Sequence, residues 1–308
     1  MHNAEQVLFI HPSHNHNFMF ENLHKAGCLV KAPYRGQTIP TRFIRAVWFK
    51  YNLPFERIWF KKTIIRYKSE VIVVFDPLIT SKYLLWLRAS FPEARIIFIY
   101  TNLVGRASHL TPDNIPEECR CEKWSYDKGD CDKYDLNHSG AFYFAHLRVK
   151  KKEPVYDVMY VGRDKGRAKY LFELENQLNK QGLKTYFHIV ADRQHKRFLK
   201  PYYKRELRYS EICDLLSESR AVLNIVLDNQ NAVTIRDMEA LFNDIKLVTN
   251  SEYIKEHDFY DSNNIFIINR NNIDGVNEFL NQSGRSMNRD VLAEYSMSAW
   301  LERILEAK

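Results

Sequence analysis

Three cations follow closely behind a glycine in the sequence YVGRDKGR, residues 160–167. Gly162 ends an apolar run typical of a strand, and Arg163, Lys165 and Arg167 come directly after it. A glycine at this point lets the backbone approach a ligand, and the start of the next helix offers free N–H groups to an anion. The pattern predicts one wall of a phosphate-binding pocket, with a solvated basic turn as the alternative. It matches neither G-x-x-x-x-G-K-[ST] nor G-x-G-x-x-G.

A second candidate anion site lies in the sequence DNQNAVTIRDMEALFND, residues 228–244. Thr234 suits the N-cap of a helix, and Arg236 and Glu239 then fall in its first turns. Free backbone N–H groups and the Arg236 guanidinium suit a diphosphate, and Glu239 can accept two hydroxyl hydrogen bonds, as a ribose requires. The alternative is an amphipathic helix that packs its apolar side chains on a sheet and leaves its charges in water.

Side chains that can accept a proton follow two apolar strands of the first half. His11, His14 and His16 come after VLFI, and Asp76 comes after VIVVF. A histidine titrates near neutral pH, and a carboxylate can deprotonate a hydroxyl group. His14, His16 and Asp76 are the predicted candidates for a catalytic base. The alternatives are a polar loop around the histidines and an ordinary strand-ending turn at Asp76.

Apolar runs rich in β-branched residues alternate with helical patterns along most of the chain. Strands are predicted at residues 7–10, 71–75, 95–100, 155–162, 184–191, 221–227, 246–250 and 264–268. Helices are predicted at residues 18–27, 81–92, 167–182, 209–220 and 234–244, and an amphipathic helix at about 289–306 closes the chain. Because the strands are continuously apolar, we expect buried parallel sheets of an α/β fold. Residues 101–145 are rich in turn residues and are predicted to be irregular.

The charged sequence LRVKKKEP, residues 147–154, is predicted to be a linker between two domains. It separates an N-terminal domain, 1–146, from a C-terminal domain, 155–285, and residues 286–308 form a helix expected to pack back toward the N-terminal lobe. Each domain is predicted to be Rossmann-like, and the two are expected to face a cleft. Ligands of open α/β sheets bind outside the carboxyl ends of the strands, so this cleft is the expected substrate site.

The composition indicates a folded protein with an anionic partner. Of the 308 residues, 45% are hydrophobic, and the formal net charge is +7. This charge suits nucleic acid, an acidic membrane surface or a phosphorylated small molecule. No apolar run approaches the roughly 18 residues of a membrane-spanning helix, and the first residues do not have the pattern of a secretion signal. We therefore expect a cytoplasmic protein, with peripheral attachment to the inner face of the cell membrane as an option.

The pattern of potential metal ligands does not predict a metal site. The five cysteines are an odd number, and we expect them to be reduced thiols. Cys119, Cys121 and Cys131 with His138 match no common zinc spacing. The carboxylate pair in the sequence DCD lies in the predicted irregular segment, not in a loop after a strand.

Basic and aromatic residues alternate in residues 41–68, TRFIRAVWFKYNLPFERIWFKKTIIRYK. This pattern suits a surface that contacts anionic lipid headgroups, with aromatic rings at the boundary and cations around them. It also suits nucleic acid, through stacking and phosphate contacts. The third alternative is a pair of amphipathic helices whose apolar face packs in the core.

The order of YDVMYVGRDKGR, YSEICDLLSESRAVLNI and TIRDMEALFNDIKLVTN resembles the donor-binding domain of bacterial GT-B glycosyltransferases, especially those that make capsule, lipopolysaccharide and exopolysaccharide. The resemblance covers residues 155–270; the first half matches only as an α/β lobe. Many members have glycines before and after the second motif, where this chain has QNAVT and LFNDIK. This departure leaves the phosphate contacts open.

The resemblance implies a role for each matching residue. Glu239 would bind the ribose of a nucleotide sugar, Thr234 and Arg236 would face its phosphates, and Gly162, Arg163 and Lys165 would lie across the cleft floor. The N-terminal domain would bind the acceptor and supply the base of an inverting reaction, while a retaining mechanism stays open. Cations and helix dipoles, without a metal ion or cofactor, would stabilise the departing diphosphate.

The sequence therefore predicts a glycosyltransferase that moves a sugar from a nucleotide-sugar donor to a bacterial surface glycan or its lipid-linked precursor. A lipid-linked acceptor would also account for the basic aromatic segment 41–68. The alternative is a non-catalytic basic protein on a Rossmann-like scaffold that binds nucleic acid. No RNP, KH or helix-turn-helix pattern supports that alternative.

Overall fold

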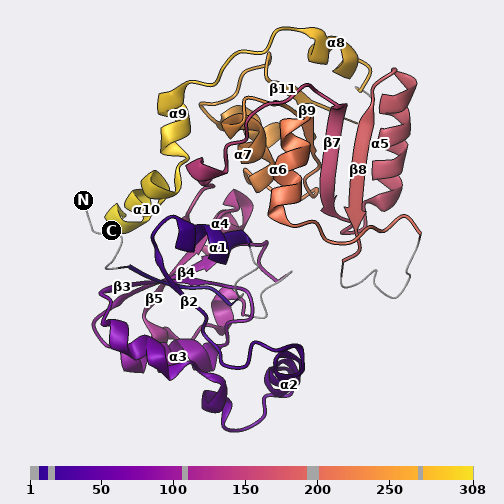
Figure 1. Cartoon of the computed structure of the whole chain (residues 1–308). Coiled ribbons are helices and arrows are strands. Elements are labelled where there is room, and N and C mark those ends of the chain that lie inside the picture. Colours follow the sequence, from indigo (N-terminus) through magenta and orange to yellow (C-terminus); the bar gives the residue numbers. More distant parts are fainter. Residues whose placement is uncertain (1–6, 13–17, 106–109, 193–200, 270–272, 308) are drawn as a thin grey trace. The chain divides into compact units, whose positions relative to one another are not determined.

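The computed structural model describes residues 7–12, 18–105, 110–192, 201–269 and 273–307. The chain divides into two compact units, Met1–Gly140 and Ala141–Lys308 (Figure 1). The boundary falls before the predicted one, because residues 141–154 belong to the second unit. For example, the Tyr143 N–H donates to the Tyr295 carbonyl over 2.8 Å, and the Val149 N–H donates to Asn243 Oδ1 over 2.7 Å.

The first unit contains a six-stranded parallel sheet in the order β2-β1-β3-β4-β5-β6. Its strands are β1 (Val7–Ile10), β2 (Leu29–Lys31), β3 (Val71–Phe75), β4 (Arg95–Tyr100), β5 (Cys121–Ser125) and β6 (Asn137–His138). The helices are α1 (Phe18–Lys25), α2 (Ile39–Lys50), α3 (Ser81–Ser90) and α4 (Lys128–Tyr134), with 3-10 turns that include η2 (Glu56–Trp59) and η3 (Lys62–Tyr67). Continuous apolar runs make both faces of β1, β3 and β4 buried, as expected for a parallel sheet covered on both sides.

The second unit contains a five-stranded parallel sheet in the order β11-β10-β9-β7-β8. Its strands are β7 (Tyr156–Arg163), β8 (Thr185–Val190), β9 (Ser219–Asn224), β10 (Lys246–Thr249) and β11 (Ile265–Ile267). The helices are α5 (Ala168–Lys180), α6 (Tyr209–Ser217), α7 (Ile235–Phe242), α8 (Val276–Asn281), α9 (Arg289–Glu294) and α10 (Met297–Glu306). Two buried apolar clusters cover the sheet, one containing Met238 of α7 and the other Leu171 of α5. None of the helices in the described ranges is long and apolar enough to cross a membrane.

The predicted α/β fold class is confirmed, and two local predictions are wrong. Residues 101–145 are not irregular throughout, since they contain β5 and α4. The first residues of β5, CEKWS, are only half-buried, and the strand therefore needs no continuous apolar run. The pattern used to predict strands is absent from it. The predicted last helix is two helices, α9 and α10, separated at Ser296, whose hydroxyl caps α10 by accepting the Ala299 N–H over 3.2 Å. The expected packing of this region toward the first lobe stays a prediction.

The first five strands of the two sheets have the same order when each sheet is numbered from its own first strand, and β6 extends the first sheet beyond them. The second strand lies on one side of the first, and the third, fourth and fifth strands lie in sequence on the other side. This 2-1-3-4-5 arrangement reverses direction between the first and third strands, and ligands of such sheets bind there, outside the carboxyl ends. The fold therefore marks β1/β3 in the first unit and β7/β9 in the second as the places to examine.

Candidate functional site

The strand-order reversal of the second unit lies where β7 ends at Arg163 and β9 ends at Asn224. The two strands pair directly, with Met159 opposite Val222. Three predicted donor-binding residues, Gly162, Arg163 and Lys165, follow or end β7. The loop after β9 leads to Thr234 and Arg236 at the start of α7. Both predicted anion motifs thus lie at the same edge of one sheet, at its reversal point.

Packing accounts for the glycine at position 162. Its φ is not in the left-handed region, but a Cβ added there would lie 2.6 Å from the Tyr160 hydroxyl oxygen and 2.9 Å from the ring carbon that carries it. Tyr160 is 3% exposed, so its ring has little space into which to move. Gly162 makes room for the Tyr160 side chain, and that hydroxyl in turn accepts from Arg167 Nη2 over 3.3 Å.

Replacing Gly162 with alanine is expected to lower the free energy of unfolding by about 1–3 kcal/mol, because the new methyl group overpacks a buried ring. Urea denaturation measures this cost. In a Tyr160→Leu background the clash partner is gone, and the same glycine-to-alanine change is expected to cost clearly less. Equal costs in the two backgrounds would show that the contact with Tyr160 is not the reason for the glycine.

The turn after Gly162 is held in place by Asp164, which is almost completely buried. Its carboxylate accepts the Ala168 N–H over 2.7 Å and the Tyr203 hydroxyl over 2.5 Å. Arg163, about half exposed, forms an ion pair with Glu206. Lys165 has a left-handed backbone with φ of 50°. The turn is thus a fixed structure in which Arg163 carries its charge on the surface.

Arg167 lies across the reversal point itself. Its guanidinium donates to the Ile225 carbonyl just after β9, and to the Asp164 and Arg163 carbonyls after β7 over 3.2 and 3.0 Å. Arg167 was predicted only as one of three cations in a phosphate-binding turn. Its place as N-cap of α5 was the available signal, because a side chain there projects beyond the end of the strand. Arg167 therefore joins the candidate site.

The start of α7 confirms the predicted cap. The Thr234 hydroxyl accepts the Arg236 N–H over 3.2 Å, and Asp237 accepts the Thr234 N–H over 2.7 Å, which completes a capping box. Asn224, the last residue of β9, donates to Asp237 Oδ1 over 2.7 Å and to the Thr234 hydroxyl over 3.1 Å. These bonds fix the start of α7 against the end of β9.

Glu239 lies in a different environment from the one predicted. Its side chain is completely buried, and Arg236, 18% exposed, forms an ion pair with it. Burial raises the pKa of the Glu239 carboxyl, while the Arg236 guanidinium and the Tyr209 hydroxyl favour its charged form. The structure therefore shows Glu239 as an anchor for Arg236, and a ribose could reach this carboxylate only after Arg236 moves. The amphipathic alternative also predicted charges in water, which is not the case for Glu239.

Three tyrosines surround the two arginines and Glu239. The hydroxyls of Tyr143 and Tyr209 lie 2.6 Å apart, and burial together with the Glu239 carboxylate raises the pKa of both. Burial also raises the pKa of Tyr160, but Arg167 and Arg236 both oppose that shift. The two guanidiniums, which come from the starts of different helices, thus act on the same phenol. Two guanidiniums that act on one phenol beside a strand-order reversal are suited to bind a diphosphate.

The strand-order reversal of the first unit contains Asp76. This residue follows β3 and is fully buried, and its Oδ1 accepts the N–H and the hydroxyl of Thr101, each over 2.8 Å. Its Oδ2 has no hydrogen-bond partner among the described residues. Burial raises the pKa of Asp76 to about 6, against the bonds from Thr101. A carboxylate with a pKa near neutrality can accept a proton from a hydroxyl group.

His11 follows the neighbouring strand β1, which pairs with β3. Its ring makes an edge contact with Phe75, with 5.5 Å between the centroids, and its backbone N–H donates to the Lys31 carbonyl over 3.1 Å. Burial lowers the pKa of His11 to about 4, so its ring is neutral at pH 7. The predicted candidates His14 and His16 lie outside the described residues.

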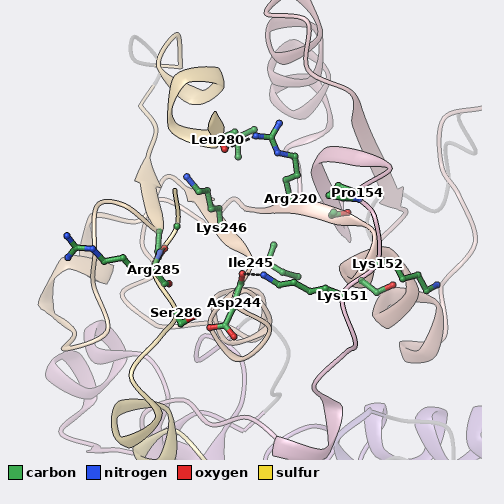
Figure 2. A pocket seen from close by; sticks show the side chains of 14 residues that line it. Lys151, Lys152, Pro154, Arg220, Asp244, Ile245, Lys246, Leu280, Arg285 and Ser286 are labelled. Carbon is green, nitrogen blue, oxygen red and sulfur yellow. Dashed lines mark hydrogen bonds between the residues drawn. The ribbon is translucent and has the colours of Figure 1, made fainter. Parts of the chain in front are cut away.

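A cavity of about 300 Å³ lies at the opposite edge of the second sheet, where β9 and β10 begin (Figure 2). Its lining is basic and includes Lys151, Lys152, Arg220, Lys246 and Arg285. These cations already have partners. Arg220 binds Asp157 over 2.8 Å and the Leu280 carbonyl over 2.7 Å, and Lys151 binds the Asp244 carbonyl over 2.6 Å. The hydrogen bonds of these lining residues attach residues 151–154 and 280–286 to the sheet. None of the predicted donor-binding residues lines the cavity.

The described residues contain no group of three or more histidine, cysteine, aspartate or glutamate side chains arranged to hold a metal ion. All five cysteines are free thiols. Burial raises the pKa of Cys28, Cys119 and Cys131 to about 11, which makes these thiols poor nucleophiles at neutral pH.

Comparison with known proteins gives weak structural likenesses. No protein-family model and no curated protein matches the sequence. A structure from Listeria monocytogenes described as a UDP-N-acetylglucosamine 2-epimerase has a TM-score of 0.46 and 10% identity, covering 97% of this chain and 94% of its own. The catalytic domain of starch synthase IV from Arabidopsis thaliana, bound to ADP and acarbose, has a TM-score of 0.44 and 9% identity over 98% and 95%. A spinosyn forosaminyltransferase has a TM-score of 0.41 and 11% identity over 98% and 95%. The α/β class of this chain follows from its strand order, not from these values.

Proposed function

We propose that this protein is a metal-independent GT-B glycosyltransferase that moves a sugar from a nucleotide-sugar donor to a glycan or lipid-linked acceptor of the bacterial surface. The observation that carries the proposal is the placement of Arg167 and Arg236 at the β7/β9 reversal point, where both act on the Tyr160 phenol. The resemblance of this region to donor-binding domains, the shared strand order of the two units and the spare oxygen of Asp76 support it.

The proposed donor site uses Arg167 and Arg236 as diphosphate ligands, together with Thr234 at the start of α7. Arg236 is partly exposed and is held by Glu239, so it is pre-oriented before a ligand arrives. Arg163 and Lys165 add surface charge, and Gly162 positions Tyr160 beside Arg167. Two guanidiniums offset the charge that develops as the bond from the sugar to the diphosphate breaks. This charge stabilisation is why no metal ion is needed in the proposal.

The proposed catalytic base is Asp76 of the acceptor-binding first unit, with His14 and His16 as the other predicted candidates. The acceptor oxygen forms a bond to the anomeric carbon, and its proton goes to Asp76 Oδ2, which the surrounding side chains must first uncover because Asp76 is fully buried. The bond between the anomeric carbon and the diphosphate oxygen breaks, and the diphosphate leaves with the electron pair. A raised pKa keeps the carboxylate basic enough for this proton transfer near pH 7.

Thermal-shift and calorimetric titrations with UDP, GDP, CMP and ADP test the donor site. We expect one of these nucleotides to raise the melting temperature and to bind with a measurable Kd. Replacing Arg167 or Arg236 with alanine is expected to weaken that binding about tenfold or more, because each removes a charge-assisted contact with phosphate. Lys169→Ala is the matched control, since Lys169 lies two residues from Arg167 and its side chain is 92% exposed.

The same titrations can overturn the proposal. Absence of any nucleotide shift, combined with salt-sensitive binding of oligonucleotides, would favour the nucleic-acid alternative. Nucleotide binding that survives in both arginine variants would place the donor elsewhere. The large change expected for Arg236→Ala must be checked by circular dichroism, because Glu239 loses its ion-pair partner in that variant.

A further inference from the structure

The segment of the first unit that contains α2, η2 and η3 exposes an unusual number of apolar side chains. Among the described residues, ten large hydrophobic side chains are exposed, and eight of them lie between residues 39 and 65: Ile39, Phe43, Ile44, Tyr51, Leu53, Phe55, Ile58 and Ile65. Phe43 is 70% exposed and Phe55 is 79% exposed. We call these eight side chains the apolar patch. Single exposed hydrophobic residues are normal, whereas a cluster of this kind marks an interaction site.

The helix that carries much of the patch exposes apolar side chains and buries a charged one. Helix α2 exposes Ile39, Phe43 and Ile44 but buries Arg45. The Arg45 guanidinium donates to the Arg35 carbonyl over 2.6 Å and lies 5.0 Å from the centre of the Tyr34 ring. The buried arginine fixes which face of α2 points inward. The third alternative, an apolar face packed in the core, holds for part of this helix, since Phe49 packs against the core with its ring 5.0 Å from that of Tyr34.

The turn after α2 is also built to present apolar side chains. Trp48 donates through its ring N–H to the Pro54 carbonyl over 2.9 Å and contacts Trp59, with 5.9 Å between the ring centroids. This holds the intervening turn, in which Phe55 has a left-handed backbone with φ of 61°. Such a conformation is rare for an aromatic residue, and it persists only when the surroundings impose it. In Figure 1, α2 is drawn at the margin of the first unit.

The charges around the apolar patch are almost all positive. Residues 39–68 contain eight lysines and arginines and one acidic residue, Glu56. Glu56 is buried, where it accepts from Thr80 and lies 3.7 Å from Lys82. The exposed cations are Arg42, Lys50, Arg57, Lys62, Arg66 and Lys68. The surface therefore combines exposed apolar side chains with exposed, predominantly positive charge.

We propose that this surface inserts the apolar patch into the interfacial region of an anionic lipid bilayer, with the surrounding cations on the headgroups. Aliphatic Ile39, Ile44 and Ile58 favour lipid over nucleic acid, because a branched aliphatic side chain cannot stack on a base as an aromatic ring can. The exposed cations around the patch disfavour a second copy of this chain as the partner, since like charges would face each other. The surface requires no donor or catalytic residue, so it stands independently of the proposed function.

Vesicle co-sedimentation tests the surface directly. The full chain is mixed with vesicles of phosphatidylcholine alone or of equal parts of phosphatidylcholine and phosphatidylglycerol. We expect binding only to the anionic vesicles, weakened by salt. The double variant Phe43→Ser and Phe55→Ser is expected to bind at least tenfold more weakly, and Arg42→Ala about fivefold more weakly. Both phenylalanines are exposed, so the fold should persist, and thermal unfolding verifies this.

Val155→Ser is the matched control, because Val155 is an exposed apolar residue outside the patch. It is expected to bind vesicles as the unchanged protein does. Absence of binding to anionic vesicles would overturn the proposal, as would equal binding by the double serine variant. Binding to a single-stranded oligonucleotide that the two serines abolish, without vesicle binding, would assign the surface to nucleic acid. Self-association that the two serines abolish would assign it to a second copy of the chain.

Discussion

Replacing Glu239 with alanine is expected to lower the free energy of unfolding by about 3–5 kcal/mol, because it leaves the charge of Arg236 without its buried partner. Glu239 is completely buried and Arg236 is largely so. The substitution also removes the carboxylate beside the Tyr143 and Tyr209 hydroxyls. Urea unfolding, followed by circular dichroism, measures the change.

Two further variants separate the charge effect from the volume effect. Glu239→Gln keeps an acceptor of the same shape beside Arg236, so we expect it to cost less than the alanine variant. The double variant Arg236→Met and Glu239→Leu removes both charges, and it is expected to recover most of the stability because the pair's desolvation cost disappears with it. The double variant should still lose nucleotide binding, since Arg236 is a proposed phosphate ligand.

A different pattern would restore the original prediction for Glu239. If the alanine variant unfolds within about 1 kcal/mol of the unchanged protein and yet loses nucleotide binding, Glu239 acts on the ligand and not as an anchor. The stability measurement thus distinguishes the ribose-binding role from the arginine-positioning role.

Replacing Asp76 with asparagine is expected to change the pH dependence of stability. Burial raises the pKa of Asp76 from 3.8 to about 6 in the folded protein, so the folded state binds the proton more tightly than the unfolded state. The protonated carboxyl therefore favours folding below about pH 4, and this contribution is lost as the pH rises to about 6. A shift of two pKa units corresponds to a loss on the order of 3 kcal/mol.

Asparagine cannot ionise, so the asparagine variant should lack this loss. Relative to the unchanged protein, its free energy of unfolding is expected to rise by roughly 3 kcal/mol between pH 4 and pH 7. Asp237, whose pKa burial also raises to about 6, is present in both proteins, and its contribution cancels. The buried amide adds a constant offset, because Oδ2 has no partner among the described residues, but the offset does not change with pH. Parallel pH profiles of the two proteins would show that Asp76 is not the titrating group.

The same variant tests catalysis with a separate readout. If Asp76 is the base, kcat is expected to fall by about 10²–10⁴-fold with the donor Kd unchanged. A change in stability without a change in kcat would leave Asp76 as a structural link between β3 and Thr101. In that case His14 and His16 become the candidates for mutation.

The local structure of the two anion motifs could be predicted from sequence because their signals are short-range. Thr234 caps a helix through bonds to residues two and three positions away, and Gly162 and Asp76 follow apolar runs that can only be buried strands. These relationships depend on chain neighbours and on side-chain polarity. The α/β class follows in the same way, from continuous β-branched runs that must be covered on both faces.

The burial of individual side chains and the order of the strands could not be predicted from the sequence. Glu239 is spaced as an exposed carboxylate would be, yet its burial depends on Tyr143 and Tyr209, which lie far from it in the chain. Arg167 looked like one cation among three, but its carbonyl partner at Ile225 is brought to it by the pairing of β7 with β9.

The amino-acid sequence by itself determined the alternation of strands and helices and the cap of α7, and it predicted the two anion motifs. Only the tertiary structure decided that Arg167 and Arg236 both act on Tyr160, that Glu239 is buried in an ion pair with Arg236, and that α2 buries Arg45 while exposing Phe43. The physical reason is the range of the forces involved. Capping and hydrophobic periodicity act within a few residues, whereas desolvation and ion pairing depend on which distant segments the sheet brings together.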